Sequence, residues 1–193
     1  MSLAVGQPMP RTLAEAWVVD AHGGGFALGE LVGGKPAVLV FLRHFACVAC
    51  SEHVTLLAPR LHEFTRLGVE VIYVGNGEPN FIEGFMERNF VDGTKVRVVT
   101  DPSLQAHAAA GLRRSFAAAF GPRGAFGLAR ALLHGFRQSA VEGDSYQQGG
   151  VIVLDRECRI AYAHADRASG DHAPLPDVIE AAMRVATDDV AVV

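Results

Sequence analysis

Two cysteines, Cys47 and Cys50, lie three residues apart in the stretch FLRHFACVAC, and Arg43 and His44 come just before them. Thiols at this spacing can close an internal disulfide, supply half of a metal site, or fill space in an apolar core. Redox chemistry requires ionisation, because the thiolate and not the thiol is the nucleophile. The elements that flank the pair decide between these alternatives.

The flanking residues predict a strand that leads directly into a helix. KPAVLVFLR, residues 35–43, is an apolar run rich in β-branched residues, typical of a buried strand. From Ser51 to Gly68 apolar residues recur at helical spacing, namely Val54, Leu57, Leu61 and Phe64. Cys47 would then lie at the carboxyl edge of the strand and Cys50 in the first helical turn. Unpaired N–H groups and the helix dipole favour a thiolate there, so we favour a redox dithiol.

Arg43 and His44 could activate the thiol or orient a substrate. Their positive charges would lower the pKa of a nearby cysteine if the side chains turn toward it. Arg43 could instead bind a peroxide or carboxylate, or pair with an acidic residue at the edge of the sheet. These alternatives remain open from the sequence.

The rest of the chain predicts a mixed α/β sheet with helices on both faces, built as one domain over residues 1–193. Further strands are expected at 69–75 and 96–101, helices at 80–90 and 102–112, and a final helix at about 174–187. Residues 149–155 and 159–166 predict an antiparallel hairpin. Asp101 is expected to cap the helix that follows it.

Composition narrows the class of protein. Half of the 193 residues are hydrophobic and the net charge is −4, which suits a globular domain and does not indicate a nucleic-acid surface. No apolar run is long enough for a membrane span. The first residues do not form a signal-peptide pattern, and three cysteines fit a reducing compartment. We therefore expect a cytoplasmic protein.

The histidines and cysteines also allow alternatives to a redox dithiol, which we favour less. His44, Cys47, Cys50 and His53 run as H-x2-C-x2-C-x2-H, a possible zinc pattern, but structural zinc sites usually join two separated ligand pairs. We expect no metal and no organic cofactor, with His53 and His62 exposed on their helix. Cys158 is expected to be structural.

Two later segments also bear on function. In SGDHAPLPD, Asp171 and His172 could lie near the active site, although we favour a cap for the final helix. An insertion at about 112–146 is rich in Phe and Arg. It could be a core helix, a contact in a homodimer, a lid over a hydrophobic substrate, or a membrane-surface element.

Several segments, taken in order, resemble the peroxiredoxin-like branch of the alkyl hydroperoxide reductase and thiol-specific antioxidant superfamily. They are VGQPMP, LGELVGGKPAVLVFLRHFACVAC, TDPSLQAHAAAGL, QQGGVIVLD and AYAHADRASGDHA, spanning about residues 5–185. The resemblance is to its C-x-x-C or C-x-x-selenocysteine members, which include prostamide/prostaglandin F synthase. It implies a thioredoxin-like fold, with Cys47 as the attacking thiol and Cys50 as its partner.

The resemblance also implies a function and its partners. The expected protein reduces a peroxide or endoperoxide, or exchanges with a disulfide, and a thioredoxin-type reductant restores its dithiol. Peroxiredoxins have a Thr or Ser three residues before the attacking cysteine and a proline four before that, whereas His44 and Val40 stand here. The alternatives are a protein dithiol–disulfide oxidoreductase and a non-catalytic binding or zinc-holding module. The T-x-x-C motif of peroxiredoxins has the same spacing as C-x-x-C, so the attacking cysteine can be aligned with either Cys47 or Cys50, and the sequence leaves the nucleophile open. The likeness of FACVACSE to the peroxiredoxin cysteine segment favours Cys47.

Overall fold

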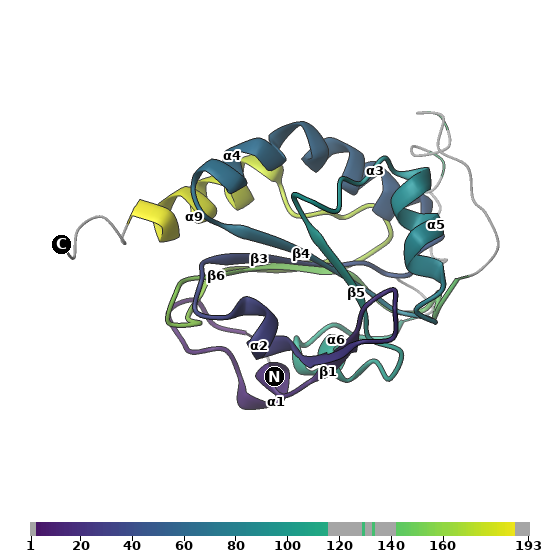
Figure 1. The fold of residues 1–193 in the computed structure, drawn as a ribbon, viewed down its shortest axis with the longest axis horizontal. Helices are drawn as coiled ribbons and strands as arrows, with labels where there is room; N and C mark the ends of the chain where they lie inside the picture. The colour runs from purple at the N-terminus through teal and green to yellow at the C-terminus, as the bar shows by residue number, and fades with distance from the viewer. Residues whose placement is uncertain (1–2, 116–128, 130–132, 134–141, 188–193) are drawn as a thin grey trace.

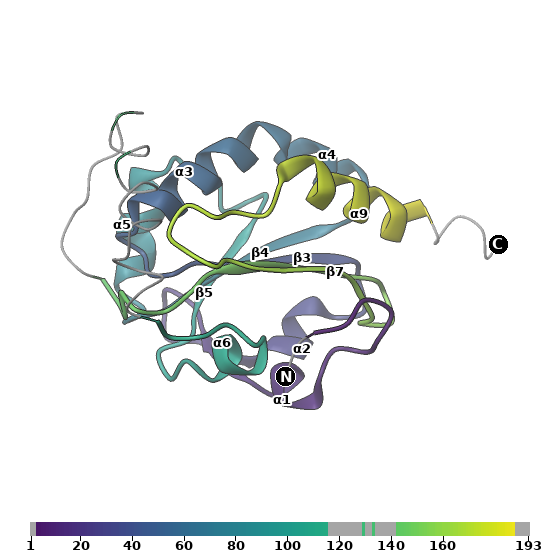
Figure 2. The same cartoon turned by 180° about the vertical axis from the view of Figure 1, so that it is seen from behind.

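A sheet of seven strands runs through the middle of the protein, with helices above and below it (Figures 1 and 2). The computed structural model describes residues 3–115, 129, 133 and 142–187. The strand order is β2-β1-β5-β4-β3-β6-β7. The strands are β1 (Trp17–Val19), β2 (Gly25–Ala27), β3 (Ala37–Phe41), β4 (Glu70–Gly75), β5 (Arg97–Thr100), β6 (Gly150–Leu154) and β7 (Ile160–Ala165).

The centre of the sheet follows the apolar runs of the sequence. The predicted strands at 35–43, 69–75 and 96–101 form β3, β4 and β5, which pair in parallel. β6 lies antiparallel to β3 and β7 antiparallel to β6, which confirms the predicted hairpin. All five residues of β3 and of β6 are buried, as expected for strands covered on both faces. The mixed sheet confirms the predicted α/β class.

Helices cover both faces of this sheet. Figures 1 and 2 show α3, α4, α5 and α9 on one face and α1, α2 and α6 on the other. The helices are α1 (Arg11–Ala14), α2 (Leu28–Val32), α3 (Val48–Leu57), α4 (Leu61–Arg66), α5 (Phe81–Arg88), α6 (Gln105–Ala109) and α9 (Leu175–Thr187). The helix predicted at 102–112 is shorter, since α6 begins at Gln105 and its N-cap residue is Leu104 rather than Asp101. The Asp101 carboxylate still accepts hydrogen bonds from the backbone N–H groups of Gln105 and His107, at 3.1 and 3.0 Å, in the first turn of α6.

Alternation along the strands divides the apolar side chains between two cores. Val38 and Val40 of β3 belong to the core that α3, α4, α5 and α9 cover. Leu39 and Phe41 belong to the core beneath α1, α2 and α6. Cys47 and Cys50 lie in the first of these cores, so the helices on that face surround the candidate chemistry.

The first helix after the cysteines differs from its prediction. One helix was expected to continue to Gly68, but a 3-10 turn, η1 (Ala58–Arg60), separates α3 from α4. Pro59 lies in this turn, and because proline has no N–H it cannot continue the α-helical ladder. Gly68 ends α4 with a left-handed φ of 68°, as expected for a helix stop.

The N-terminal elements were not predicted. β1 and β2 have only three residues each, too few to display an alternating pattern, and they extend the sheet beyond β5. Most of the predicted insertion at about 112–146 lies outside the described residues, so its four alternatives stay predictions. No helix in the described part of the chain is both long and apolar enough to span a membrane.

Candidate active site

Cys47 is the N-cap residue of α3, at the end of the loop that leaves β3. Its Sγ accepts a hydrogen bond from the backbone N–H of Cys50 at 3.4 Å. Cys50 lies in the first helical turn, and its own Sγ accepts a hydrogen bond from the backbone N–H of Arg43 at 3.2 Å. Both cysteines are 4% exposed. The strand-to-helix corner predicted from the sequence therefore brings the two thiols together.

The two thiols are driven to opposite ionisation states. A hydrogen bond from the Cys50 thiol lowers the pKa of Cys47 to about 6 despite its burial, with help from the charge of Arg43 and from the Cys50 N–H. Burial, together with the adjacent Cys47 sulfur, raises the pKa of Cys50 above that of an ordinary thiol. At a pKa of about 6, a thiol is about 90% ionised at pH 7. These opposite directions favour the thiolate at Cys47 and the protonated thiol at Cys50.

Arg43 is buried beneath this corner and is bound by backbone carbonyl groups. Its Nε donates to the Gln147 carbonyl at 3.0 Å and its Nη2 to the Ser145 carbonyl at 2.7 Å. Within the described residues no carboxylate forms an ion pair with it. Its charge therefore remains available to lower the pKa of Cys47, which is one of the roles that the sequence left open for this residue.

His44 does not supply the positive charge that was expected of it. The residue is 3% exposed, and burial lowers its pKa to about 4, with repulsion from the neighbouring Arg43 adding to the effect. The ring is therefore neutral at neutral pH. Its Nδ1 is buried without a hydrogen-bond partner in the described structure.

Contacts from two other segments fix the loop between β3 and α3. The Asn76 side-chain amide donates to the Arg43 carbonyl, and the Phe45 N–H donates to the Glu142 carbonyl at 3.2 Å. The ring of Phe45 lies directly over Gly75, where a Cβ would come within 2.3 Å of it. Glycine at the end of β4 therefore permits the ring to close under the thiols.

His53 and His172 lie against each other near Cys47. A place for His172 near the active site was one of two alternatives drawn from the sequence, whereas His53 was expected to be exposed. His53 is 8% exposed, so its predicted exposure is wrong, whereas His62 is exposed as predicted. The two rings stack with centroids 4.6 Å apart, because the loop before α9 covers this face of α3. The favoured alternative for the segment SGDHAPLPD was a cap for the final helix, and the Asp171 side chain does not supply that cap. Its carboxylate accepts a hydrogen bond from the Arg167 N–H at 2.9 Å, inside that loop.

Asp166 completes this cluster, and the sequence analysis missed it. Its Oδ2 lies 3.7 Å from Nδ1 of His172 and its Oδ1 lies 3.6 Å from Nε2 of His164. A Cβ on Gly149 would lie 2.6 Å from the Phe41 carbonyl and 2.9 Å from Asp166 Oδ2, so only glycine leaves room for this approach. Asp166 and His172 lie within the segment AYAHADRASGDHA, the one signal that could have marked them.

The H-x2-C-x2-C-x2-H pattern does not form a cluster of ligands in this structure. The described residues contain no group of three or more His, Cys, Asp or Glu side chains that could hold a metal ion. The reason is that these side chains point in different directions: the Cys50 sulfur turns back toward the Arg43 N–H, while the His53 ring turns toward His172.

Cys158 lies away from the other two thiols. It is at the turn between β6 and β7 with a φ of 57°, and its side chain packs against the core on the opposite face of the sheet from Cys47 and Cys50. Burial raises its pKa, and Asp155 and Glu157 add to this effect. These contacts fit the structural role expected from the sequence.

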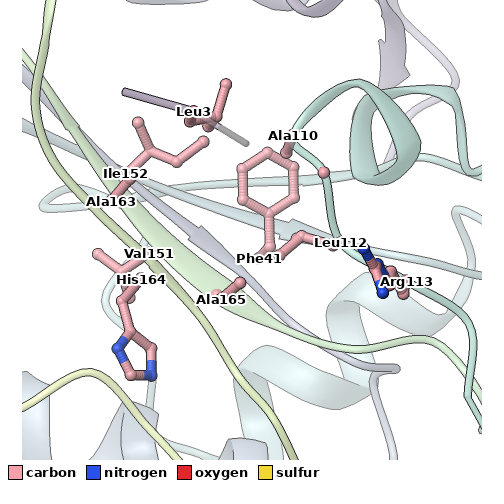
Figure 3. Close-up of a pocket in the computed structure, with 12 residues that line it drawn as sticks. Leu3, Phe41, Ala110, Leu112, Arg113, Val151, Ile152, Ala163, His164 and Ala165 are labelled. Carbon is pink, nitrogen blue, oxygen red and sulfur yellow. The ribbon is translucent and has the colours of Figure 1, made fainter. Parts of the chain in front are cut away.

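A cavity of about 460 Å³ opens on the face of the sheet that faces away from Cys47. Figure 3 shows Leu3, Phe41, Leu112 and Ile152 around it, while the His164 ring points away from the Phe41 ring. Its apolar side chains belong mostly to the second core. The cavity is therefore separated by the sheet from the candidate active site.

Comparison with known proteins shows the family to which this chain is related. The model of the family described as AhpC/TSA antioxidant enzyme matches residues 56–168, more than half of the chain, beginning after the two cysteines. Human peroxiredoxin-like 2C is 31% identical over 91% of this chain and 80% of its own length. Prostamide/prostaglandin F synthase of Salmo salar is 28% identical over 80% of this chain and 78% of its own length.

Solved structures support the same fold. A peroxiredoxin-like protein from Aquifex aeolicus superposes with a TM-score of 0.62 at 15% identity, covering 96% of this chain and 89% of that one. The likeness confirms the predicted thioredoxin-like fold. Together with the family match, it makes the Cys47–Cys50 pair the C-x-x-C of a peroxiredoxin-like thiol redox protein. The chain belongs to the AhpC/TSA antioxidant enzyme family.

Proposed function

We propose that this protein is a thiol-dependent enzyme that reduces a peroxide or an endoperoxide, with Cys47 as nucleophile and Cys50 as resolving thiol. The observation that carries the proposal is the unequal pair at the start of α3. Cys47 has a pKa lowered to about 6, and Cys50, whose pKa is raised, keeps its proton beside it. A nucleophilic thiolate next to a protonated resolving thiol is what a two-cysteine peroxidase requires.

The proposed cycle has three balanced steps. The Cys47 thiolate attacks one oxygen of a hydroperoxide, so that an S–O bond forms and the O–O bond breaks. The departing oxygen takes a proton and leaves as an alcohol or water, and Cys47 becomes a sulfenic acid. Cys50 then displaces the sulfenic oxygen as water to give the Cys47–Cys50 disulfide, which an external dithiol of thioredoxin type reduces.

Burial of both thiols favours a small oxidant over a protein disulfide. Attack on a disulfide of a folded protein requires the sulfur to be open to a bulky partner, whereas both cysteines are 4% exposed. A small hydroperoxide presents an O–O bond that needs far less access, whereas reduction of the Cys47–Cys50 disulfide by a thioredoxin-type protein requires this corner to open after oxidation. The name of the Salmo salar relative, prostamide/prostaglandin F synthase, adds endoperoxides to the substrates worth testing.

Arg43 has a supporting role in this proposal. Its guanidinium is bound by backbone carbonyls, so it acts by its charge on the thiolate and by fixing the loop rather than by a free ion pair. His44, which is neutral, and Val40 take the places of the peroxiredoxin Thr and Pro. The thioredoxin-type reductant, the homodimer and the cytoplasmic location remain predictions.

Stopped-flow kinetics on a Cys158→Ser background test the proposal. Reduced protein is mixed with cumene hydroperoxide and, separately, with a small aromatic disulfide. We expect fast oxidation by the hydroperoxide, abolished by Cys47→Ser. With Cys50→Ser, excess hydroperoxide should carry Cys47 to sulfinic acid, because no thiol is left to resolve it.

Other results would favour the alternatives. Slow reaction with the hydroperoxide but fast exchange with the disulfide, with mixed disulfides trapped by Cys50→Ser, would indicate a dithiol–disulfide oxidoreductase. Inertness toward both, with zinc bound by the parent protein and lost on Cys50→Ser, would indicate a zinc-holding module.

A further inference from the structure

A buried histidine–carboxylate pair lies close enough to Cys47 for the charge of His172 to lower the pKa of that thiol, and the pair has no part in the cycle above. The Nδ1 atom of His172 lies 3.7 Å from Oδ2 of Asp166, and 11% and 6% of the two side chains are exposed. His53 of α3 stacks on the His172 ring at 4.6 Å between centroids. The loop before α9 carries this ring, which is held by Asp166 just after β7 and by His53 of α3.

The second nitrogen of the His172 ring is left without a partner. Nε2 is buried and makes no hydrogen bond within the described residues. Because unpaired buried donors are unfavourable, such an atom is rare in a folded protein and asks for an explanation. An oxygen of a bound substrate would supply the missing acceptor.

The charges around His172 favour its protonated form. Burial lowers the pKa of the ring, but the Asp166 carboxylate, the Cys47 thiolate and Glu52 together raise it above that of an ordinary histidine. His53 faces the ring from α3 and is neutral, because burial and the charge of His172 lower its pKa to about 3. Of the two stacked rings, His172 is therefore the one whose surroundings favour the protonated form.

We infer that His172 is the catalytic acid of the proposed reaction, donating a proton through Nε2 to the oxygen that leaves when Cys47 breaks the O–O bond. Asp166 is the positioning residue that holds Nδ1, and His53 supports the face of the ring. The inference rests on the proposed function and adds to it the source of the proton.

The step balances without a further reactant. The Cys47 thiolate forms an S–O bond with the hydroxyl oxygen of ROOH, and the O–O electron pair passes to the RO oxygen. That oxygen takes the proton of His172 Nε2 and leaves as ROH, so that the products are sulfenic acid, alcohol and neutral His172. The ring then recovers a proton from solvent.

A comparison of leaving groups separates an acid from a residue that only assists ionisation of Cys47. Hydrogen peroxide expels hydroxide, which needs a proton, whereas peracetic acid expels acetate, which is stable without one. Both rates are measured for His172→Gln at pH 7 and divided by the thiolate fraction, read from absorbance at 240 nm. We expect the rate with hydrogen peroxide to fall about 100-fold or more, the usual size of general acid catalysis, and the rate with peracetic acid to change less than about threefold.

Two outcomes would overturn the inference in distinguishable ways. Equal losses with both oxidants would show that His172 acts only on the thiolate or on the fold, while the peroxidase proposal would stand. A parent protein inert to both oxidants would remove the peroxidase proposal, and the acid with it.

A second variant covers the case in which His172→Gln does not fold. Asp166→Asn keeps the ring and removes its counter-charge, so the alkaline limb of the hydrogen peroxide rate should move to lower pH. The rate of alkylation by iodoacetamide requires no acid and should have no such limb. If the alkaline limb of the hydrogen peroxide rate stays at the same pH in Asp166→Asn, the proposed role of the Asp166–His172 pair is contradicted. The matched control is His62→Gln, at an exposed histidine of α4, which should leave all rates unchanged.

Discussion

Replacing Cys50 with alanine should raise the pKa of Cys47, because the Cys50 thiol is the largest influence that lowers it. A hydrogen bond to a charged group contributes about 1.5–3 kcal/mol, and the lower end applies because a thiol is a weak donor. At 1.36 kcal/mol for each factor of ten, about 1.5 kcal/mol moves the pKa from about 6 to about 7. The backbone N–H of residue 50 and the charge of Arg43 remain, and they prevent a full return to an ordinary value.

The assay is a titration of thiolate absorbance at 240 nm on a Cys158→Ser background. At pH 7 the ionised fraction of Cys47 should fall from about 90% to about 50%, and at pH 5 the fraction should fall about tenfold. Cys50→Ser is the matched control, since its hydroxyl can still donate and should keep the pKa near 6. A Cys50→Ala variant that titrates like the parent protein would refute the assignment of the thiol hydrogen bond as the main cause.

Three further substitutions probe the surroundings of the thiols. Arg43→Gln removes two hydrogen bonds to buried carbonyls and the charge near Cys47, so urea unfolding should show a loss of about 2–4 kcal/mol and the Cys47 pKa should rise; unchanged stability would contradict the buried contacts. Gly75→Ala places a Cβ 2.3 Å from the Phe45 ring and should cost about 1–3 kcal/mol in the same assay, whereas a neutral result would mean that the ring can move aside. Burial lowers the pKa of His53 to about 3 in the folded protein, so as the pH falls below 6.5 this histidine gains a proton only in the unfolded chain. The free energy of unfolding should therefore fall by about 2 kcal/mol between pH 6.5 and pH 5 because of this group. His53→Phe should abolish that part of the acid sensitivity.

The central strands and the position of the cysteines could be predicted because the signals are local. β3, β4 and β5 are long apolar runs, and the strand that leads into Cys47 fixes the cysteine at the start of a helix whatever else surrounds it. β1 and β2, with three residues each, carry too little pattern to be recognised, since they are strands only through their partners. Pro59 could have warned that the helix after Cys50 would break.

The histidine cluster could not be predicted because it depends on tertiary packing. His53 looks like an exposed helical residue until the loop that carries His172 folds across it, and nothing in the local sequence joins these two positions. The same limit applies to His44, whose neutral state follows from burial beside Arg43 and not from its residue type. Burial removes the charge that was expected of His44, and burial is a property of the whole fold.

Peptide mass spectrometry of reduced protein after one equivalent of cumene hydroperoxide would show whether Cys47 and Cys50 act together on a peroxide. We expect a Cys47–Cys50 disulfide to form within seconds, with Cys158 unmodified and one molecule of alcohol released for each disulfide. Protein that stays reduced for minutes in hydroperoxide, or that is oxidised first at Cys158, would contradict it.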